Sequence, residues 1–339
     1  MKIIVDAFGG DNAPVAVLEG AAQAVKELGA SIVLTGDEEK IRATAGEKNI
    51  DLTGIRIVHA PTVIPVCEEP TQIRKKYKDC SMARGFQLLA AGEGDAFITA
   101  GSTGAMVVGA TLIVKRIRGV KRAAIGTIIP NSKGHYMLLD SGANEVCRPE
   151  MLCQFGVMGS VYMERIMGVK NPRVGLVNIG TEDSKGTELQ VEANKQLRGA
   201  GLNYVGNVEA REVPLGGCDV AVADGFTGNV MLKLTEGLAK MFSGELKGMF
   251  LSSMGTKIAA VLMKNQVKGF KKKLDAGEVG GALLLGIRRP VIKAHGNSDG
   301  RAFKNAIRQA MLCCENGVVQ EITRSLEKLA AEDDGEQNS

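Results

Sequence analysis

The segment Cys218–Lys233 reads CDVAVADGFTGNVMLK, and it predicts the unit from which most of the chain is built. Its first residues are β-branched or apolar and end at Asp224-Gly225, and a helical apolar pattern follows Thr227-Gly228-Asn229 directly. The segment therefore predicts a strand, a glycine turn and a helix start. Backbone N–H groups at a helix N-terminus are unpaired and attract anions, which small residues allow to approach. We expect this turn to bind a phosphate or a carboxylate.

The same construction occurs earlier, in the segment Asp95–Met106, DAFITAGSTGAM. Aligning Asp95 with Asp219 superposes the Gly-x-Thr-Gly turns at 101–104 and 225–228. Two matching units suggest one cleft lined by two helix N-termini that hold anions. The alternative is that both turns only cap their helices.

A third strand, loop and helix open the chain, with the strand Lys2–Ala7, a glycine-rich loop at 8–12 and a helical pattern from Pro14 to Leu28. The segments Ala123–Ile129 and His135–Asp140 read as two strands joined by the turn at 130–134. Strand and helix patterns alternate up to about residue 236, which predicts an α/β fold with a mostly parallel sheet and helices on both faces.

Polar or glycine residues stand at the carboxyl ends of five predicted strands, at Asp6, Gly101, Asp140, Asn178 and Asp224. In open α/β sheets, ligands bind outside the carboxyl ends of the strands. We therefore expect these positions to form one polar rim that holds the functional site.

The composition is that of an ordinary globular protein, with 45% hydrophobic and 24% charged residues. No apolar run is long enough to span a membrane, and the first residues do not resemble a secretory signal, so we expect a cytoplasmic location. The seven cysteines form no C-x-x-C pair, and the three histidines show no metal-ligand spacing. We expect reduced thiols and no catalytic metal.

Lysine and arginine gather in three clusters, at Arg74–Lys78, Lys115–Arg122 and Lys268–Lys273. Aromatic residues make up only 4% of the chain and tryptophan is absent, so we expect no nucleic-acid partner. An acidic protein or an anionic membrane surface fits the clusters better. Alternatively, each cluster is a solvated helix face.

The alternation stops at residues 237–274, where a helical insertion rich in Met and Lys is expected. An apolar stripe recurs there at steps of four residues, and several lysines lie off it. Such a stripe either packs against a second subunit or lies in an anionic membrane surface. The sheet pattern resumes weakly at 280–286, a final helix is expected from Arg301 to about Leu329, and 330–339 is expected to be an acidic, disordered tail.

Common nucleotide and hydrolase motifs are absent. The sequence contains no G-x-x-x-x-G-K-[ST], no strand followed by G-x-G-x-x-G with a distal acid, and no G-x-S-x-G. Kinases, Rossmann dehydrogenases and α/β hydrolases are therefore disfavoured. An α/β enzyme that binds anions remains.

The chain resembles the bacterial phosphate acyltransferases, which convert acyl-acyl carrier protein and inorganic phosphate into acyl phosphate for phospholipid synthesis. The similar motifs run in order from Val5 to about Ile322, as VDAFGGDNAP, KDCSM, AGSTGA, LDSGAN, NIGTEDSKG, VGNVE, ADGFTGNVMLK, GGALLLG, KAHGNSD and AFKNAIRQA. The turn Asp224–Asn229 is also similar to one in phosphate acetyltransferases. The family usually has Asn at the position of Ser102 and Ser at that of Cys80.

The resemblance implies a fold like that of isocitrate and isopropylmalate dehydrogenases. Residues 1–329 are then one catalytic unit, in which two interleaved lobes share a central sheet with a protruding helical segment. It further implies a homodimer, no cofactor, and inorganic phosphate and an acidic acyl carrier protein as partners. An enzyme that passes a lipid-like acyl phosphate to a membrane acyltransferase would gain from peripheral membrane attachment. The fold likeness alone leaves a dinucleotide-dependent hydroxy-acid dehydrogenase as the alternative, although its metal and adenine motifs are not found.

The implied reaction is direct attack of phosphate on the thioester carbonyl, so positioning and charge stabilisation should carry most of the rate. We expect Lys185 or Lys233 to be the nearby cation and Asp224 or His295 to protonate the leaving thiolate. The alternatives are that Asp224 caps a helix and that His295 is a loop histidine bonded to backbone. The expected site consists of the catalytic residues Asp224, Asn229, His295 and Lys185 and the phosphate- or acyl-binding residues Asp6, Gly9, Gly10, Asp11, Ser102, Thr103, Gly104, Asp140, Asn144, Asn178, Glu182, Thr227, Gly228 and Lys233.

Overall fold

A computed structural model describes residues 1–274 and 280–337, which form an 11-stranded sheet with the strand order β3-β2-β1-β4-β11-β10-β5-β6-β9-β7-β8. The strands are β1 (Lys2–Asp6), β2 (Ser31–Gly36), β3 (Ile55–His59), β4 (Ala96–Thr99), β5 (Ala124–Asn131), β6 (Gly134–Leu139), β7 (Val174–Asn178), β8 (Tyr204–Glu209), β9 (Val220–Val222), β10 (Ala282–Leu285) and β11 (Val291–Lys293). The helices are α1 (Val15–Leu28), α2 (Glu38–Lys48), η1 (Pro70–Arg74), α3 (Ser81–Ala90), α4 (Thr103–Gly109), the π-helical η2 (Ala110–Val114), α5 (Pro149–Arg165), α6 (Glu188–Gly199), α7 (Gly225–Leu251), α8 (Met254–Leu262), α9 (Lys264–Leu274), α10 (Gly300–Glu315) and α11 (Val318–Gln337).

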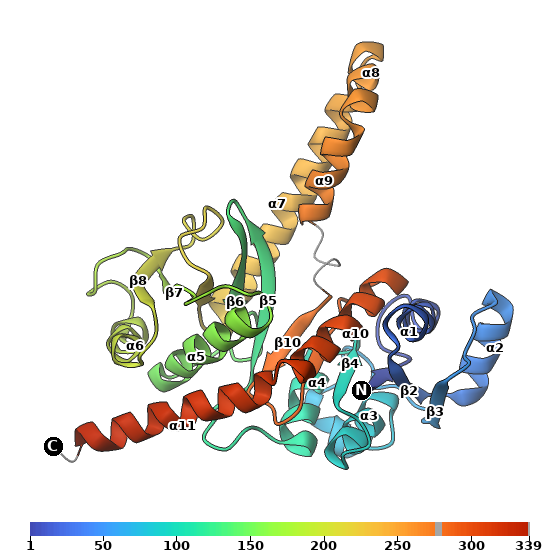
Figure 1. Cartoon of the computed structure of the whole chain (residues 1–339), viewed down its shortest axis with the longest axis horizontal. Coiled ribbons are helices and arrows are strands. Elements are labelled where there is room, and N and C mark those ends of the chain that lie inside the picture. Colours follow the sequence, from blue (N-terminus) through green and yellow to red (C-terminus); the bar gives the residue numbers. More distant parts are fainter. Residues whose placement is uncertain (275–279, 338–339) are drawn as a thin grey trace.

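Core side chains alternate between the two faces of the sheet, as strand geometry requires. Ile3, Val5 and Ile98 belong to the core cluster that α1, α5, α10 and α11 cover. On the other face, Phe97 and Ile125 pack with α3 and α4, and Ile129 packs with the first part of α7. The predicted α/β fold, with a mostly parallel sheet and helices on both faces, is confirmed (Figure 1).

The strands form two groups that run in opposite directions. Strands β1, β2, β3, β4 and β11 are mutually parallel, and so are β6, β7, β8 and β9. Between the groups, β10 is antiparallel to both β11 and β5, and β5 is antiparallel to β6. The carboxyl ends of β1 and β4 therefore lie at one edge of the sheet, and those of β6, β7 and β9 at the other. The prediction of a single rim is wrong, because the hairpin at 130–134 reverses the chain.

The predicted helical insertion is confirmed as a hairpin that protrudes from the sheet, with α7 rising to α8 and α9 returning (Figure 1). Helix α7 already starts at Gly225, and Met231 and Leu232 pack against the core before it leaves the body. Beyond that point the apolar stripe is uncovered, with Met254, Ile258 and Leu262 exposed by 75%, 62% and 78%. Residues 275–279 and the side chains of Lys271–Lys273 lie outside the described part of the chain.

The expected C-terminal helix is two helices, because Gly317 adopts a positive φ of 60° between α10 and α11. Helix α11 extends along the lower side of the molecule in Figure 1 and reaches Gln337, beyond its expected end near Leu329. The last two residues of the expected tail, 338–339, are outside the described residues.

Candidate active site

A row of polar side chains crosses the sheet between α4 and α7. Alternation along the strands places Asp6, Thr99, Lys293 and Thr127 on the same face as Ile4, Phe97, Val291 and Ile125, which are core residues. Lys293 pairs with Thr99 of β4 on one side and with Ala282 of β10 on the other. We call Asp6, Thr99, Lys293 and Thr127 the polar row. Polar groups on this mostly apolar face mark a candidate ligand site.

Asp6 and Thr99 are the most buried members of the polar row, and Lys293 beside them is partly buried. The Asp6 carboxylate accepts a hydrogen bond from Thr99 Oγ1 at 2.8 Å and one from the Phe8 N–H at 3.2 Å. Burial raises the pKa of Asp6, and these hydrogen bonds and the Lys293 charge oppose the shift. Lys293 Nζ donates to the carbonyl oxygens of Ala100 and Ala294 at 2.8 and 2.9 Å.

The glycine-rich loop after β1 closes over this end of the polar row. A Cβ on Gly9 would lie 2.6 Å from the Gly101 nitrogen, and Gly10 adopts a φ of +100°. The Asp11 N–H donates to the Gly296 carbonyl at 2.7 Å, which ties this loop to the one after β11. Only glycine allows the two loops to approach this closely.

The beginning of α4 lies beside this loop. Ser102 is its N-cap and accepts from the Ala105 N–H at 3.4 Å, while Cys80 caps α3 in the same way through the Ala83 N–H. Ser102 and Cys80, which differ from the residues usual in the family, thus both serve as helix N-caps in this chain. His295 is exposed, and its Nδ1 accepts a 3.4 Å bond from the Asn297 N–H.

Asp140 organises the turn at the other end of the polar row. The buried carboxylate accepts bonds from the backbone N–H groups of Ile125, Gly142, Ala143 and Asn144 and from the Asn144 side chain, at 2.8–3.1 Å. Burial raises the pKa of Asp140, and these donors work against the shift. The adjacent Ser141 hydroxyl lies 2.7 Å from that of Thr127 and so connects this turn to the polar row.

The start of α7 packs directly on the Asp140 turn. Asp224 caps the helix by accepting from the Thr227 N–H at 2.8 Å and from the Thr227 hydroxyl at 2.9 Å, which is the capping role that the sequence left open. A Cβ on Gly228 would lie 1.9 Å from the Asp140 carbonyl oxygen. Asn229 faces Gly142, whose Cβ would lie 3.5 Å from the Asn229 amide.

The N-termini of helices α4 and α7 do not point toward one another. Strands β4 and β9 run in opposite directions with four strands between them, so the two helices begin at opposite edges of the sheet. The expectation that both helix ends line a single anion site is therefore wrong. The polar row, which runs along the face between the helices, connects the two regions.

The other expected residues lie away from the polar row. Asn178 donates to the Lys185 carbonyl at 3.0 Å, and Lys185 is 3.8 Å from Glu182 in the turn after β7. Lys233 is exposed on α7 and pairs with Glu236 at 2.8 Å. The structure thus brings together Asp6, the 9–11 loop and the start of α4, and separately Asp140, Asn144 and the start of α7.

Sequence reasoning missed Lys293, Thr99 and Thr127. The motif KAHGNSD was recognised as a whole, but only its histidine was selected as a candidate. The sequence feature that could have indicated Lys293 is its place at the end of the apolar run PVIK, at 290–293. The structure shows that this run pairs with the buried strand β4.

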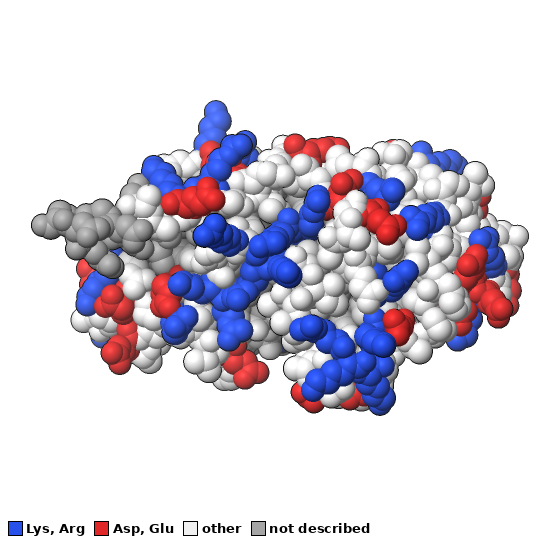
Figure 2. Space-filling model, turned by 90° about the horizontal axis from the view of Figure 1, so that it is seen from below, with Lys and Arg blue, Asp and Glu red and all other residues white. Residues whose placement is uncertain are grey.

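Figure 2 shows the molecule from below the view of Figure 1, and exposed basic side chains gather on this face. The connection from η2 to β5 contributes several of them. Lys115, Arg118, Lys121 and Arg122 are exposed in this connection, and all four basic residues of the cluster Arg74–Lys78 are exposed too. Burial raises the pKa of the Cys147 thiol to about 12, the charges of Asp140 and Asp224 add to this shift, and the charge of Arg122 opposes it. Arg122 therefore lies close to the start of α7.

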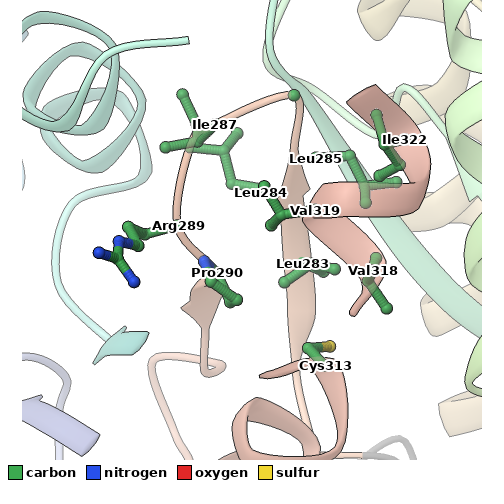
Figure 3. Close-up of a pocket in the computed structure, with 11 residues that line it drawn as sticks. Leu283, Leu284, Leu285, Ile287, Arg289, Pro290, Cys313, Val318, Val319 and Ile322 are labelled. Carbon is green, nitrogen blue, oxygen red and sulfur yellow. The ribbon is translucent and has the colours of Figure 1, made fainter. Parts of the chain in front are cut away.

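A separate apolar pocket lies between β10, α10 and α11, away from the polar row (Figure 3). Aliphatic side chains such as Leu285, Val319 and Ile322 line it, and Arg289 is the charged residue at its edge. The buried thiol of Cys313 also lines this pocket. Among the described residues, no group of three His, Cys, Asp or Glu side chains is arranged to hold a metal ion.

A family described as "Fatty acid synthesis protein" matches residues 1–321. The phosphate acyltransferase of Alkaliphilus oremlandii is 45% identical over 329 residues, which cover 97% of this chain and 98% of that protein. The phosphate acyltransferase of Acetivibrio thermocellus is also 45% identical, over 98% of both chains. The chain belongs to the phosphate acyltransferase family. It is therefore an acyltransferase, as its sequence motifs predicted.

Solved structures agree with this family at the level of the fold. A phosphotransacetylase from Streptococcus pyogenes matches with a TM-score of 0.63 at 19% identity and covers 94% of both chains. The EutD phosphotransacetylase from Staphylococcus aureus matches with a TM-score of 0.59 at 18% identity, over 93% of this chain and 94% of that one. Membership of the phosphate acyltransferase family gives no support to the dehydrogenase alternative.

Proposed function

We propose that the enzyme transfers the acyl group of an acyl-acyl carrier protein to inorganic phosphate and so makes acyl phosphate for phospholipid synthesis. The observation that carries this proposal is the polar row, a set of hydrogen-bonding groups on an apolar sheet face in a chain whose relatives are phosphate acyltransferases. Phosphate is already a nucleophile near neutral pH, so such a site needs to position it and stabilise charge.

The two ends of the polar row suit different parts of the reaction. Loop 9–11, Asp6 and the start of α4 at Ser102, Thr103 and Gly104 would surround the phosphate. Asn229 and the start of α7, which Asp140 and Asn144 hold in place, would contact the part of the acyl carrier substrate that lies away from the reacting thioester carbonyl, because four strands separate β9 from β4. In this arrangement Asp224 positions α7 through its cap, while His295, Lys185 and Lys233 act at the margin. Asn178 and Glu182 support Lys185.

The proposal is tested by mixing the purified enzyme with acyl-acyl carrier protein and inorganic phosphate. We expect free carrier thiol and hydroxylamine-trapped acyl phosphate to appear in equal amounts and only when phosphate is present. NAD and Mg²⁺ should have no effect. Asn229→Ala, at an exposed position, should lower this rate without unfolding the chain. Thiol release that does not depend on phosphate would contradict the proposed reaction.

We also propose that the basic face guides docking of the acidic carrier protein. Changing Lys115, Arg116 and Arg118 to Glu should raise KM for the acyl carrier protein by about tenfold or more at low salt, because exposed charges steer association. KM for phosphate should change little, and added salt should shrink the difference between variant and parent. An equal rise in both KM values would show that these residues do not act in docking.

The protruding hairpin is proposed to have two roles, pairing with the hairpin of a second subunit along its arms and touching an anionic membrane at its tip. Met254, Ile258 and Leu262 are exposed near that tip, where lysines can meet lipid headgroups. No helix in the described part of the chain is long and apolar enough to cross a bilayer. Contact at the cytoplasmic face would deliver acyl phosphate to a membrane acyltransferase.

Met254→Glu combined with Ile258→Glu should abolish co-sedimentation with anionic vesicles, because each carboxylate opposes burial in the membrane and repels the headgroups. Gel filtration with light scattering checks that the variant keeps the oligomeric state of the parent. Vesicle binding that survives in a variant of unchanged oligomeric state would eliminate the hairpin tip as the anchor.

A further inference from the structure

We propose that Lys293 is a catalytic residue whose ammonium group binds the attacking phosphate and then protonates the departing thiolate. This inference rests on the proposed function and gives both the cation and the acid of the reaction to one side chain. Lys185 and Lys233 are poorer choices for the cation, because each is exposed and already paired with a glutamate on the margin of the fold.

The geometry holds Lys293 in one orientation. Its Nζ donates to the Ala100 carbonyl at 2.8 Å and to the Ala294 carbonyl at 2.9 Å, at the carboxyl ends of β4 and β11. An ammonium group has three N–H donors, so these two bonds leave one for a ligand. The side chain is only partly buried and lies on the polar row, next to loop 9–11.

The surroundings tune the lysine for proton transfer. Burial lowers the pKa of Lys293 to about 8, although the carboxylates of Asp6 on β1 and Asp11 in the adjoining loop act in the opposite direction. His295 follows it at the end of β11 but is exposed. An ordinary thiol has a pKa of about 8.5, and a general acid works best when its pKa is close to that of its partner and to the working pH.

The reaction gives Lys293 a proton in place of the one that it loses. An oxygen of HPO₄²⁻ forms a bond to the thioester carbonyl carbon, the C–S bond breaks, and sulfur leaves with the electron pair. Lys293 gives a proton to this thiolate and becomes a neutral amine. The new acyl phosphate is more acidic than the phosphate from which it formed, so its remaining P–OH proton returns to the amine. The net products are acyl phosphate dianion and free thiol, and the ammonium group is regenerated.

Two variants separate the two roles. Lys293→Met should lower kcat/KM by about 10²- to 10⁴-fold, the range for loss of a general acid, and should also raise KM for phosphate. Lys293→Arg keeps the positive charge but donates a proton poorly, so kcat should fall about 10²-fold while KM for phosphate stays near the parent value. Lys195→Met removes an exposed lysine on α6 and is the control, with activity unchanged.

The leaving group and the pH profile complete the test. In a thioester of a nitrothiophenol, the leaving group is a stable thiolate that departs without taking up a proton. Lys293→Arg should therefore recover most of its activity with that substrate. With the carrier protein, parent activity should fall above about pH 8 as Lys293 loses its proton, and this fall should be absent in Lys293→Arg. Circular dichroism verifies that both variants fold.

The possible results distinguish this inference from the proposed function. Normal acyl phosphate formation by the parent, together with near-normal kcat in folded Lys293→Met, would overturn the role of Lys293 alone. Equal loss with both leaving groups in Lys293→Arg would overturn the proton transfer. A parent that makes no acyl phosphate from any thioester would overturn the proposed function itself.

Discussion

Asp140→Ala is expected to destabilise the folded chain by about 3–5 kcal/mol and to abolish acyl transfer. The buried carboxylate accepts hydrogen bonds from four backbone N–H groups and one side-chain amide, all in the turn between β6 and α5 or on β5. Alanine leaves these donors without an acceptor, and buried donors without partners are costly. The turn would open, and the start of α7, which packs on it, would move.

Chemical denaturation followed by circular dichroism measures the stability change. Asp51→Ala is a suitable control, because this exposed carboxylate accepts local hydrogen bonds from the Thr53 N–H and the Thr53 side chain, so its loss should cost less than about 1 kcal/mol. If Asp140→Ala were as stable as Asp51→Ala, the turn would not depend on its carboxylate.

Gly228→Ala should lower the stability of the folded chain by a similar amount, because the added methyl group would clash with its surroundings. The added Cβ would lie 1.9 Å from the Asp140 carbonyl oxygen and 3.0 Å from its carbon, and neither backbone atom can rotate away. The helix must therefore shift, at an expected cost of about 3 kcal/mol or more, because overpacking against fixed atoms forces backbone movement. We expect poor expression, a lowered Tm and a loss of activity larger than the loss of folded protein.

Gly237→Ala is the matched control on the same helix. A Cβ there meets no atom within 4 Å, and alanine favours a helix over glycine by about 1 kcal/mol. Its Tm should rise slightly and its activity should persist. Identical Tm values for the two alanine variants would show that α7 does not need its close approach to the Asp140 turn.

The sequence was sufficient to predict the elements and much less informative about their directions. The turn at 130–134 was recognised as a connection between two strands, and β5 and β6 form that hairpin. Its further consequence is that every later strand of the second group runs against the first. Periodicity shows which residues face the core but not which way a strand points, so five polar strand ends were placed on one rim.

The site could be predicted only in part, because capping and catalysis use the same residue types. Asp224 and Ser102 were selected next to helix starts, and both accept N–H bonds as caps. Lys293 was missed because β11 has only three residues and its strand pattern is weak. Its burial comes from β4 and β10 on either side, and this tertiary effect leaves no trace in the local sequence.

The position of β11 has a consequence for how the protein is made. Phe97 of β4 pairs with Val291, so the central sheet is completed by a strand that leaves the ribosome nearly two hundred residues later. Until then β4 is an open edge with unpaired backbone groups, and the apolar residues around it have no cover from α10. A nascent chain in this condition is prone to pair with the wrong strand and to aggregate. Slow translation upstream of residue 282 would prolong that exposure, and chaperones that shield nascent chains would shorten it.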